Sequence, residues 1–110
     1  MSKARTYSRY SIEATTLLGK QIKLGRKQLK WTEHELADRA GISRGTLQKI
    51  EKGSLTCAIG LVFEVAMLAG VKLFDTEKAS LAMHLDMTSD KIALLPKAVR
   101  KARKVVDDDF

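Results

Sequence analysis

The stretch that decides the fold is residues 32–53, TEHELADRAGISRGTLQKIEKG. It opens on Thr32, which Glu35 follows three positions later. This spacing is the pattern of a capping box, in which the hydroxyl and the carboxylate each accept a hydrogen bond from the first turn of a helix. Gly41 can adopt the left-handed backbone of a helix end without strain. The pattern therefore predicts a helix at residues 33–40.

The second part of the stretch begins at Ser43, whose hydroxyl is suited to cap a helix, and ends at Gly53. It predicts a helix at residues 44–52. Small or apolar side chains occupy the positions where two crossed helices and their turn would meet: Leu36, Ala37, Ala40, Ile42, Leu47 and Ile50. Together with a glycine in the turn, this order is typical of a helix-turn-helix unit rather than of an ordinary helical hairpin.

Apolar periodicity predicts helices on both sides of this unit, at residues 12–29, 58–69, 76–87 and, after a break at 88–90, 92–106. Segment 58–69 is apolar almost all round, so we expect a second chain to cover part of it. Residues 71–75 have the composition of a short strand, and a lone strand is unstable. The same strand of a second copy is its simplest partner. We therefore expect a homodimer whose interface includes Val71, Leu73 and Phe74.

Charge is distributed unevenly along the chain, whose formal net charge is +7. The first thirty residues contain eight basic side chains and one acidic side chain. A concentrated positive field suits a polyanion, either nucleic acid or an anionic membrane surface, although a simple solvated surface is the alternative. Segment 12–29 lacks the bulky aromatic residues of a membrane-binding helix. No apolar run approaches the roughly 20 residues that span a bilayer. We therefore expect no membrane partner.

Residues that could support catalysis or metal binding are few and scattered. His34 and His84 are far apart in the sequence, and Cys57 has no identifiable base. We therefore expect no enzyme activity, no metal site and no cofactor. A single cysteine and the absence of a signal-peptide pattern lead us to expect a cytoplasmic protein.

Residues 32–53 resemble the helix-turn-helix of lambda-repressor-like (XRE/Cro-type) regulators. With Trp31 before them and a buried helix and short strand after them, they are similar to HipB-type antitoxins. The resemblance implies an all-α, lambda repressor-like helix-turn-helix bundle with a short dimer-forming strand and a helical C-terminal extension. We expect a basic flexible arm at residues 1–11, a DNA-binding and dimerisation domain at 12–75, and an extension with an acidic tail at 76–110.

The resemblance implies a sequence-specific transcriptional regulator that binds a palindromic operator in double-stranded DNA. It further implies an antitoxin of a HipBA-like type II toxin–antitoxin system, which represses its own operon and neutralises a HipA-like kinase. A stand-alone repressor without a toxin partner is the alternative. The tail, Asp107, Asp108, Asp109 and Phe110, either is a disordered end or contacts the kinase, with the aromatic side chain as an anchor.

Residues at the start of the second motif helix point into the major groove in such proteins. We expect base readout by Ser43, Arg44, Thr46, Gln48 and Lys49. Arg44 could donate two hydrogen bonds to guanine, and Gln48 could pair similarly with adenine. We expect phosphate contacts from Lys27, Lys30, Arg39 and Lys52, with Arg5 and Arg9 in the arm.

Glu33 is a departure from the family pattern. The family often has glutamine at this position, where it meets a phosphate and braces the second helix. A carboxylate near a phosphate is repulsive, so the phosphate role is not carried over to Glu33. We expect it instead to interact favourably with the dipole of the helix that it begins.

Overall fold

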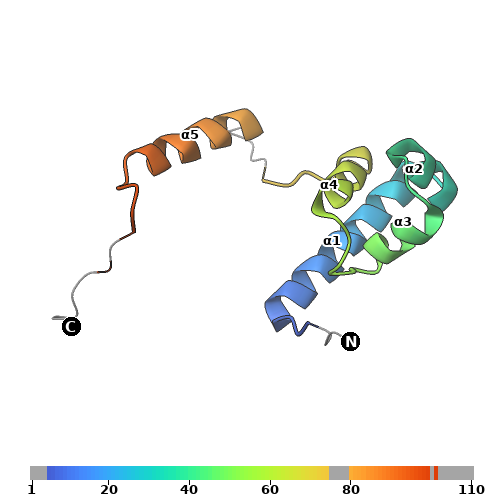
Figure 1. Ribbon diagram of the computed structural model, residues 1–110. Coiled ribbons are helices and arrows are strands. Elements are labelled where there is room, and N and C mark those ends of the chain that lie inside the picture. Colours follow the sequence, from blue (N-terminus) through green and yellow to red (C-terminus); the bar gives the residue numbers. More distant parts are fainter. Residues whose placement is uncertain (1–4, 75–79, 100, 102–110) are drawn as a thin grey trace. The chain divides into compact units, whose positions relative to one another are not determined.

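The computed structural model describes residues 5–74, 80–99 and 101. Regular structure within these ranges is entirely helical, in agreement with the expected all-α class: α1 (Arg9–Gln28), α2 (Glu33–Ala40), α3 (Arg44–Glu51), α4 (Ile59–Leu68) and α5 (Leu81–Ala93) (Figure 1). The chain divides into two units, Met1–Leu73 with α1 to α4 and Phe74–Phe110 with α5.

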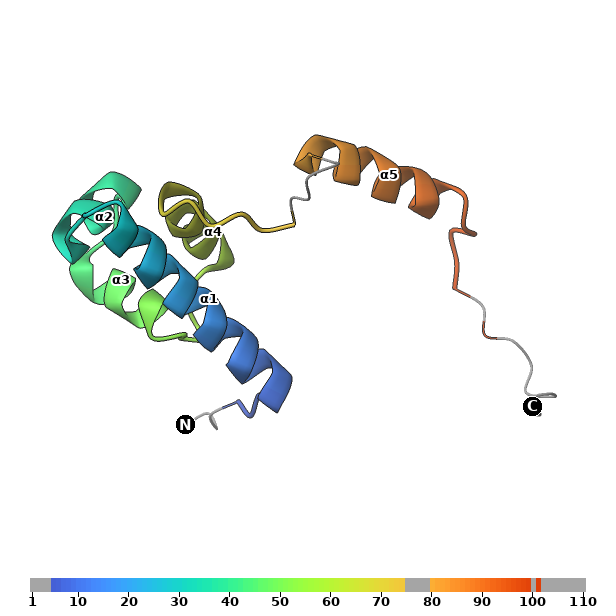
Figure 2. The same cartoon turned by 180° about the vertical axis from the view of Figure 1, so that it is seen from behind.

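Helix α1 begins earlier than the sequence predicted. The Ser8 hydroxyl accepts a hydrogen bond from the Ser11 amide at 3.1 Å, so Ser8 is the N-cap and the helix begins at Arg9 rather than at Ile12. Residues 9–11, assigned to a flexible arm, are therefore helical. The first turns of α1 project beyond the other three helices of its unit (Figures 1 and 2).

The predicted helix-turn-helix unit is formed by α2 and α3, and we refer to these two helices with their turn as the corner. The capping box is present: the Glu35 amide donates to the Thr32 hydroxyl at 3.1 Å, and the Thr32 amide donates to the Glu35 carboxylate at 2.8 Å. Gly41 ends α2 with a φ of 71°, and the Ser43 hydroxyl caps α3 by accepting from the Thr46 amide at 3.0 Å. The capping box and the glycine at the helix end each involve residues only a few positions apart. This explains why the bounds of α2 agree with the prediction.

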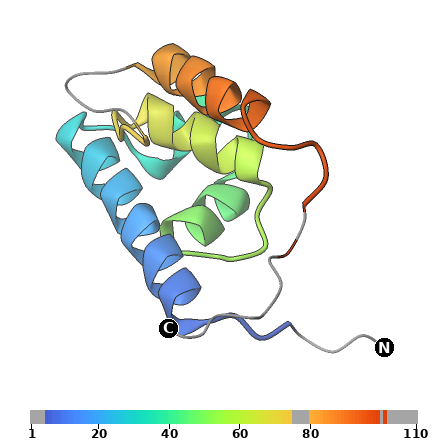
Figure 3. The same ribbon diagram turned by 90° about the vertical axis from the view of Figure 1, so that its left-hand side faces the viewer.

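A small apolar core joins the four helices of the first unit. Its buried members are Ile22, Leu36, Ala37, Leu47, Ile50, Val65, Ala66 and Ala69. Helix α3 packs against α1 and α2, and α2 also packs against α4, which follows a returning loop (Figure 3). A Cβ on Gly19 would lie 2.5 Å from the Glu51 carbonyl oxygen, so this glycine permits the close approach of α1 to α3.

The predicted strand at residues 71–75 is not seen in the described part of the chain. The Val71 amide closes the end of α4 by donating to the Ala66 carbonyl at 2.8 Å. Val71 and Leu73 are half-buried and pack against the core of their own unit. Phe74 has a φ of 68°, which is outside the β region. Val71 and Leu73 therefore pack on the core after α4, and the described residues form no strand here.

Helix α5 also differs from its prediction. It runs from Leu81 to Ala93 without the break expected at 88–90. The expected helix at 92–106 does not form over residues 94–99. Residues 100 and 102–106 lie outside the described residues, as do 76–79. The Ser80 hydroxyl caps α5 by accepting from the Met83 amide at 3.3 Å. None of the residues of α5 is buried.

Candidate nucleic-acid interface

Helix α3 has a buried side and an open side. Leu47 and Ile50 are 0% and 3% exposed and fix the helix to the core, as predicted. Arg44 and Lys49 are exposed, and Gln48 is half-buried beside them. A helix held from behind, with two cations and an amide on its free side, can present hydrogen-bond donors and acceptors to base edges.

The two predicted hydroxyl contacts already have local partners. The Ser43 hydroxyl donates to the Thr46 hydroxyl at 3.0 Å, while it also accepts from the Thr46 amide. Ser43 is exposed and Thr46 is half-buried. Both side chains therefore have a structural role at the start of α3, in addition to the base readout that the sequence predicts for them.

Glu33, at the first position of α2, brings the two main candidate reading residues together. Its Oε1 accepts a hydrogen bond from Nε2 of Gln48 at 3.0 Å and lies 3.7 Å from Nη2 of Arg44. The Gln48 hydrogen bond is the main reason why the pKa of Glu33 lies below its usual value. The positive charges of Arg26, Arg44 and Lys23 lower it further, against the opposing effect of desolvation. Glu33 thus bridges α2 and α3, a contact that the helix-dipole interpretation did not include.

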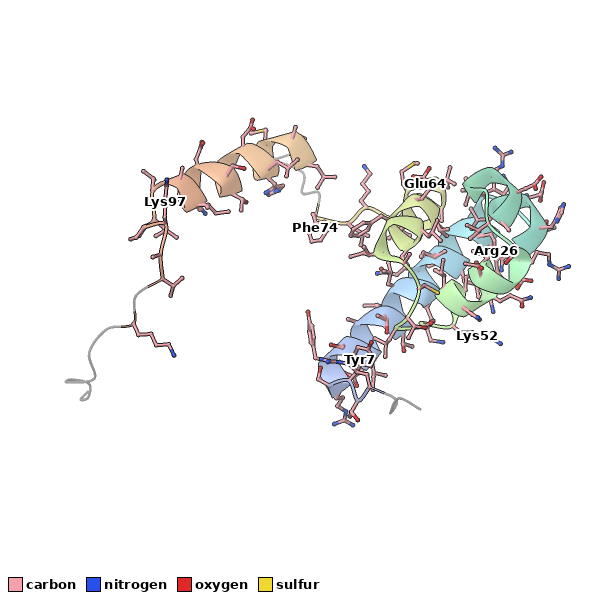
Figure 4. The ribbon with its side chains drawn as sticks, in the orientation of Figure 1. Tyr7, Arg26, Lys52, Glu64, Phe74 and Lys97 are labelled. Atoms are coloured by element: carbon pink, nitrogen blue, oxygen red, sulfur yellow. The ribbon has the colours of Figure 1, made fainter. Side chains whose placement is uncertain are left out.

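Behind the open side, a buried ion pair fixes α1 to the end of α3. Nε of Arg26 donates to the Glu51 carboxylate at 2.8 Å, and Nη2 donates to its other oxygen at 3.1 Å. The side chains are only 7% and 5% exposed, and Arg26 lies between the two helices (Figure 4). Nη1 also donates to the Trp31 carbonyl at 3.0 Å. Sequence analysis missed this pair, although Arg26 falls on the buried stripe of α1, four positions after Ile22.

The candidate phosphate-binding residues lie at helix ends. Lys27 and Lys30 are exposed at the end of α1, and Lys52 is exposed at the end of α3 (Figure 4). Arg39 is exposed on α2, with its guanidinium 4.3 Å from the centre of the Trp31 ring. Lys23, which the sequence did not single out, is exposed on α1, and its charge reaches Glu33.

Two further arginines lie at the other end of α1. Arg5 lies 5.6 Å from the centre of the Tyr7 ring, and Arg9 pairs with Glu13 at 3.7 Å in an exposed position. They belong to the part of the unit that projects past α2, α3 and α4 (Figure 2). Helix α1 therefore separates them from Lys30, which follows its other end.

Among the described residues, none of the helices combines the length and the hydropathy that a membrane span requires. The proposed partner-binding residues, Asp107 to Phe110, lie outside the described residues.

Comparison with known proteins agrees with this geometry. The helix-turn-helix family matches residues 22–73, which include all of α2, α3 and α4. Over 44 residues the chain is 41% identical to an uncharacterized HTH-type transcriptional regulator of Methanocaldococcus jannaschii, and this stretch covers 40% of the chain and 67% of that regulator. No solved structure matches the chain. The chain, in which α2 and α3 are the two motif helices, therefore belongs to the family of helix-turn-helix transcriptional regulators.

Proposed function

We propose that this regulator binds a specific DNA sequence by placing the open side of α3 in the major groove. The observation that carries the proposal is the arrangement of Arg44, Gln48 and Lys49 on a helix whose opposite side is buried. Arginine pairs with guanine through two hydrogen bonds, and glutamine pairs with adenine in the same way. A rigid support matters because such pairing tolerates little misplacement of the side chain.

Charge around α3 supports a polyanionic partner. Lys23, Lys27, Lys30 and Lys52 are all exposed in the same unit. Phosphate contacts by such residues release counterions. A plot of the logarithm of the binding constant against the logarithm of the salt concentration should therefore have a slope of about −0.9 for each contact. These contacts set the affinity for any DNA, whereas base contacts from α3 set the preference for one sequence.

We further propose that the regulator binds as a homodimer. On α4, Ile59, Phe63 and Met67 follow one another at four-residue spacing, and they are 69%, 40% and 58% exposed. Val65 and Ala66 face the core from the same helix. A second copy over the exposed stripe would remove it from water, and two copies would read half-sites about 34 Å apart on a palindrome. We therefore propose an interface on α4 in place of the strand expected at 71–75.

Arg44→Ala and Arg44→Lys test the base-reading role of α3. DNA selected from a random pool by the full chain provides the probe, and binding is measured by fluorescence anisotropy against the selected and a scrambled duplex. Arg44→Ala should weaken specific binding by about 10- to 100-fold. Arg44→Lys should keep binding to the scrambled duplex but weaken the preference for the selected duplex, because lysine lacks the planar guanidinium.

Lys97→Ala is the control, since Lys97 is an exposed cation of the second unit (Figure 4). It should leave the sequence preference unchanged. Unaltered preference in both Arg44 variants would refute the proposed role of α3.

A toxin partner is the second candidate. The observation that favours a protein partner of any kind is the exposed apolar side of α5. Leu81, Leu85 and Ile92 share one side of this helix and are 48%, 67% and 65% exposed. Identification of the partner as a HipA-like kinase rests on the sequence resemblance alone. Deletion of residues 106–110 should weaken binding to a co-expressed kinase of that class and spare DNA binding. Loss of both activities, or of neither, would count against the assignment.

A further inference from the structure

We propose that Glu33 is a specificity-determining residue, because its carboxylate holds the amide of Gln48 in one orientation for base readout. The inference rests on the proposed function of α3 and concerns a residue that is not itself expected to touch a base. Two contacts carry it: the 3.0 Å hydrogen bond from Nε2 of Gln48 to Oε1 of Glu33, and the 3.7 Å separation of that oxygen from Nη2 of Arg44.

The orientation of the Gln48 amide follows from hydrogen-bond chemistry. An ionised carboxylate can only accept hydrogen bonds, whereas an amide has one accepting and one donating end. Turning the Gln48 side chain over would bring its Oε1 against Oε1 of Glu33, with no proton between the two oxygens. A glutamate carboxyl is ionised at neutral pH, and the lowered pKa of Glu33 favours that form further. Nε2 of Gln48 therefore stays on Glu33, and Oε1 of Gln48 stays available on the other side.

This orientation favours one purine over the other. Gln48 retains a free carbonyl oxygen and one N–H that Glu33 does not use. Adenine offers a matching donor at N6 and acceptor at N7, while guanine offers two acceptors at O6 and N7. Guanine would thus leave the carbonyl oxygen of Gln48 facing another oxygen. Glu33 thus restricts the base that Gln48 can read to adenine.

Arg44 responds differently to the same carboxylate. Its side chain is 60% exposed and has five N–H donors, so the contact at 3.7 Å leaves most of them available. Removal of the carboxylate charge would strengthen the attraction of this region to phosphates on every sequence. A change in general affinity therefore reports the charge of Glu33, and a change in the choice between adenine and guanine reports its hold on Gln48.

The alternative is a purely structural role, in which Glu33 only stabilises the N-terminus of α2. That terminus already has its capping box from Thr32 and Glu35. An effect on helix stability would weaken all complexes alike and would not select one base. The base preference at a single position thus separates the two roles.

Glu33→Gln provides the test, since it keeps the size of the side chain and allows either orientation of Gln48. The full chain, its Glu33→Gln and Gln48→Ala variants and the double variant are each used to select DNA from a random pool. The position whose preference is lost in Gln48→Ala identifies the base pair read by Gln48. At that position Glu33→Gln should lower the ratio of adenine to guanine affinity by about tenfold.

In the Gln48→Ala background, Glu33→Gln should not change this ratio further. Asp38→Asn is the matched control, because it removes one negative charge from an exposed position of the same helix. It should leave the ratio unchanged.

An unchanged adenine-to-guanine ratio in Glu33→Gln, with specific binding intact, would overturn the inference and leave the proposed function standing. An equal loss at all positions would also overturn it, since that result describes a stability effect. If the unsubstituted chain selects no sequence from the pool, the proposed function itself fails.

Discussion

The α2–α3 corner and α5 show two ways in which a helix can occur in this protein. Helices α2 and α3 have eight residues each, and α5 has thirteen. All three have a side-chain cap at the N-terminus. The shorter pair contributes Leu36, Ala37, Leu47 and Ile50 to the core, while α5 buries none of its residues. Since isolated helices shorter than about 12–15 residues are marginal in water, burial rather than length stabilises the corner.

The largest effect should come from breaking the ion pair behind the corner. Glu51→Ala leaves the buried guanidinium of Arg26 without its carboxylate, so the free energy of unfolding should fall by about 3 kcal/mol or more. Urea unfolding followed by Trp31 fluorescence measures the loss. Glu13→Ala is the control, because its pair with Arg9 is exposed, and it should give no measurable change. Equal behaviour of the two variants would refute the structural role of the buried pair.

Two leucines allow the corner and α5 to be compared by the same substitution. Leu47 in α3 is fully buried, whereas Leu85 in α5 is 67% exposed. Leu47→Ala should cost about 3 kcal/mol in the free energy of unfolding. Leu85→Ala should cost less than about 0.5 kcal/mol. A larger cost for Leu85→Ala that grows with protein concentration would show that a second copy covers α5.

The corner could be predicted because its signals are local. Thr32 and Glu35 are three positions apart, and Gly41 and Ser43 act on adjacent turns. The outward positions of Arg44 and Lys49 follow directly once Leu47 is placed inside. Burial of these helices was predicted for the same reason, since apolar spacing fixes which side faces the core.

The remaining features depend on contacts that sequence spacing does not reveal. Arg26 and Glu51 are 25 positions apart, so no local spacing in the sequence pairs them. The composition of residues 71–75 suits a strand, but Val71 and Leu73 instead cover the core. The break expected at 88–90 assumed that polar residues end a helix, yet their low helix propensity costs only tenths of a kcal/mol each.

Two residues with left-handed backbones allow a smaller test of how the corner is built. Lys30, before α2, has a φ of 61°, and Gly41, after it, has a φ of 71°. Gly41→Ala should lower the free energy of unfolding by about 1 kcal/mol, although a Cβ there would meet no neighbour within 4 Å. Lys30→Gly should raise it by about 0.5 kcal/mol, because strain is relieved at a small entropic cost. Changes of the same sign in both thermal unfolding curves would contradict this account.

The smallest expected effect concerns the carboxylate that joins the two helices of the corner. The pKa of Glu33 lies below its usual value, chiefly because Gln48 donates a hydrogen bond to the ionised form. Gln48→Ala should therefore raise the pKa of Glu33, as measured by carbon-detected NMR titration. Arg44→Ala should raise it less, because Arg44 contributes only through its more distant charge. A group with a lowered pKa stabilises the fold above its ordinary pKa and loses that contribution as the pH falls through the titration of the folded state. The free energy of unfolding that is lost on acidification should thus be smaller in Gln48→Ala than in the unsubstituted chain. If the NMR titration of Glu33 is the same in both, the contact with Gln48 is absent in solution.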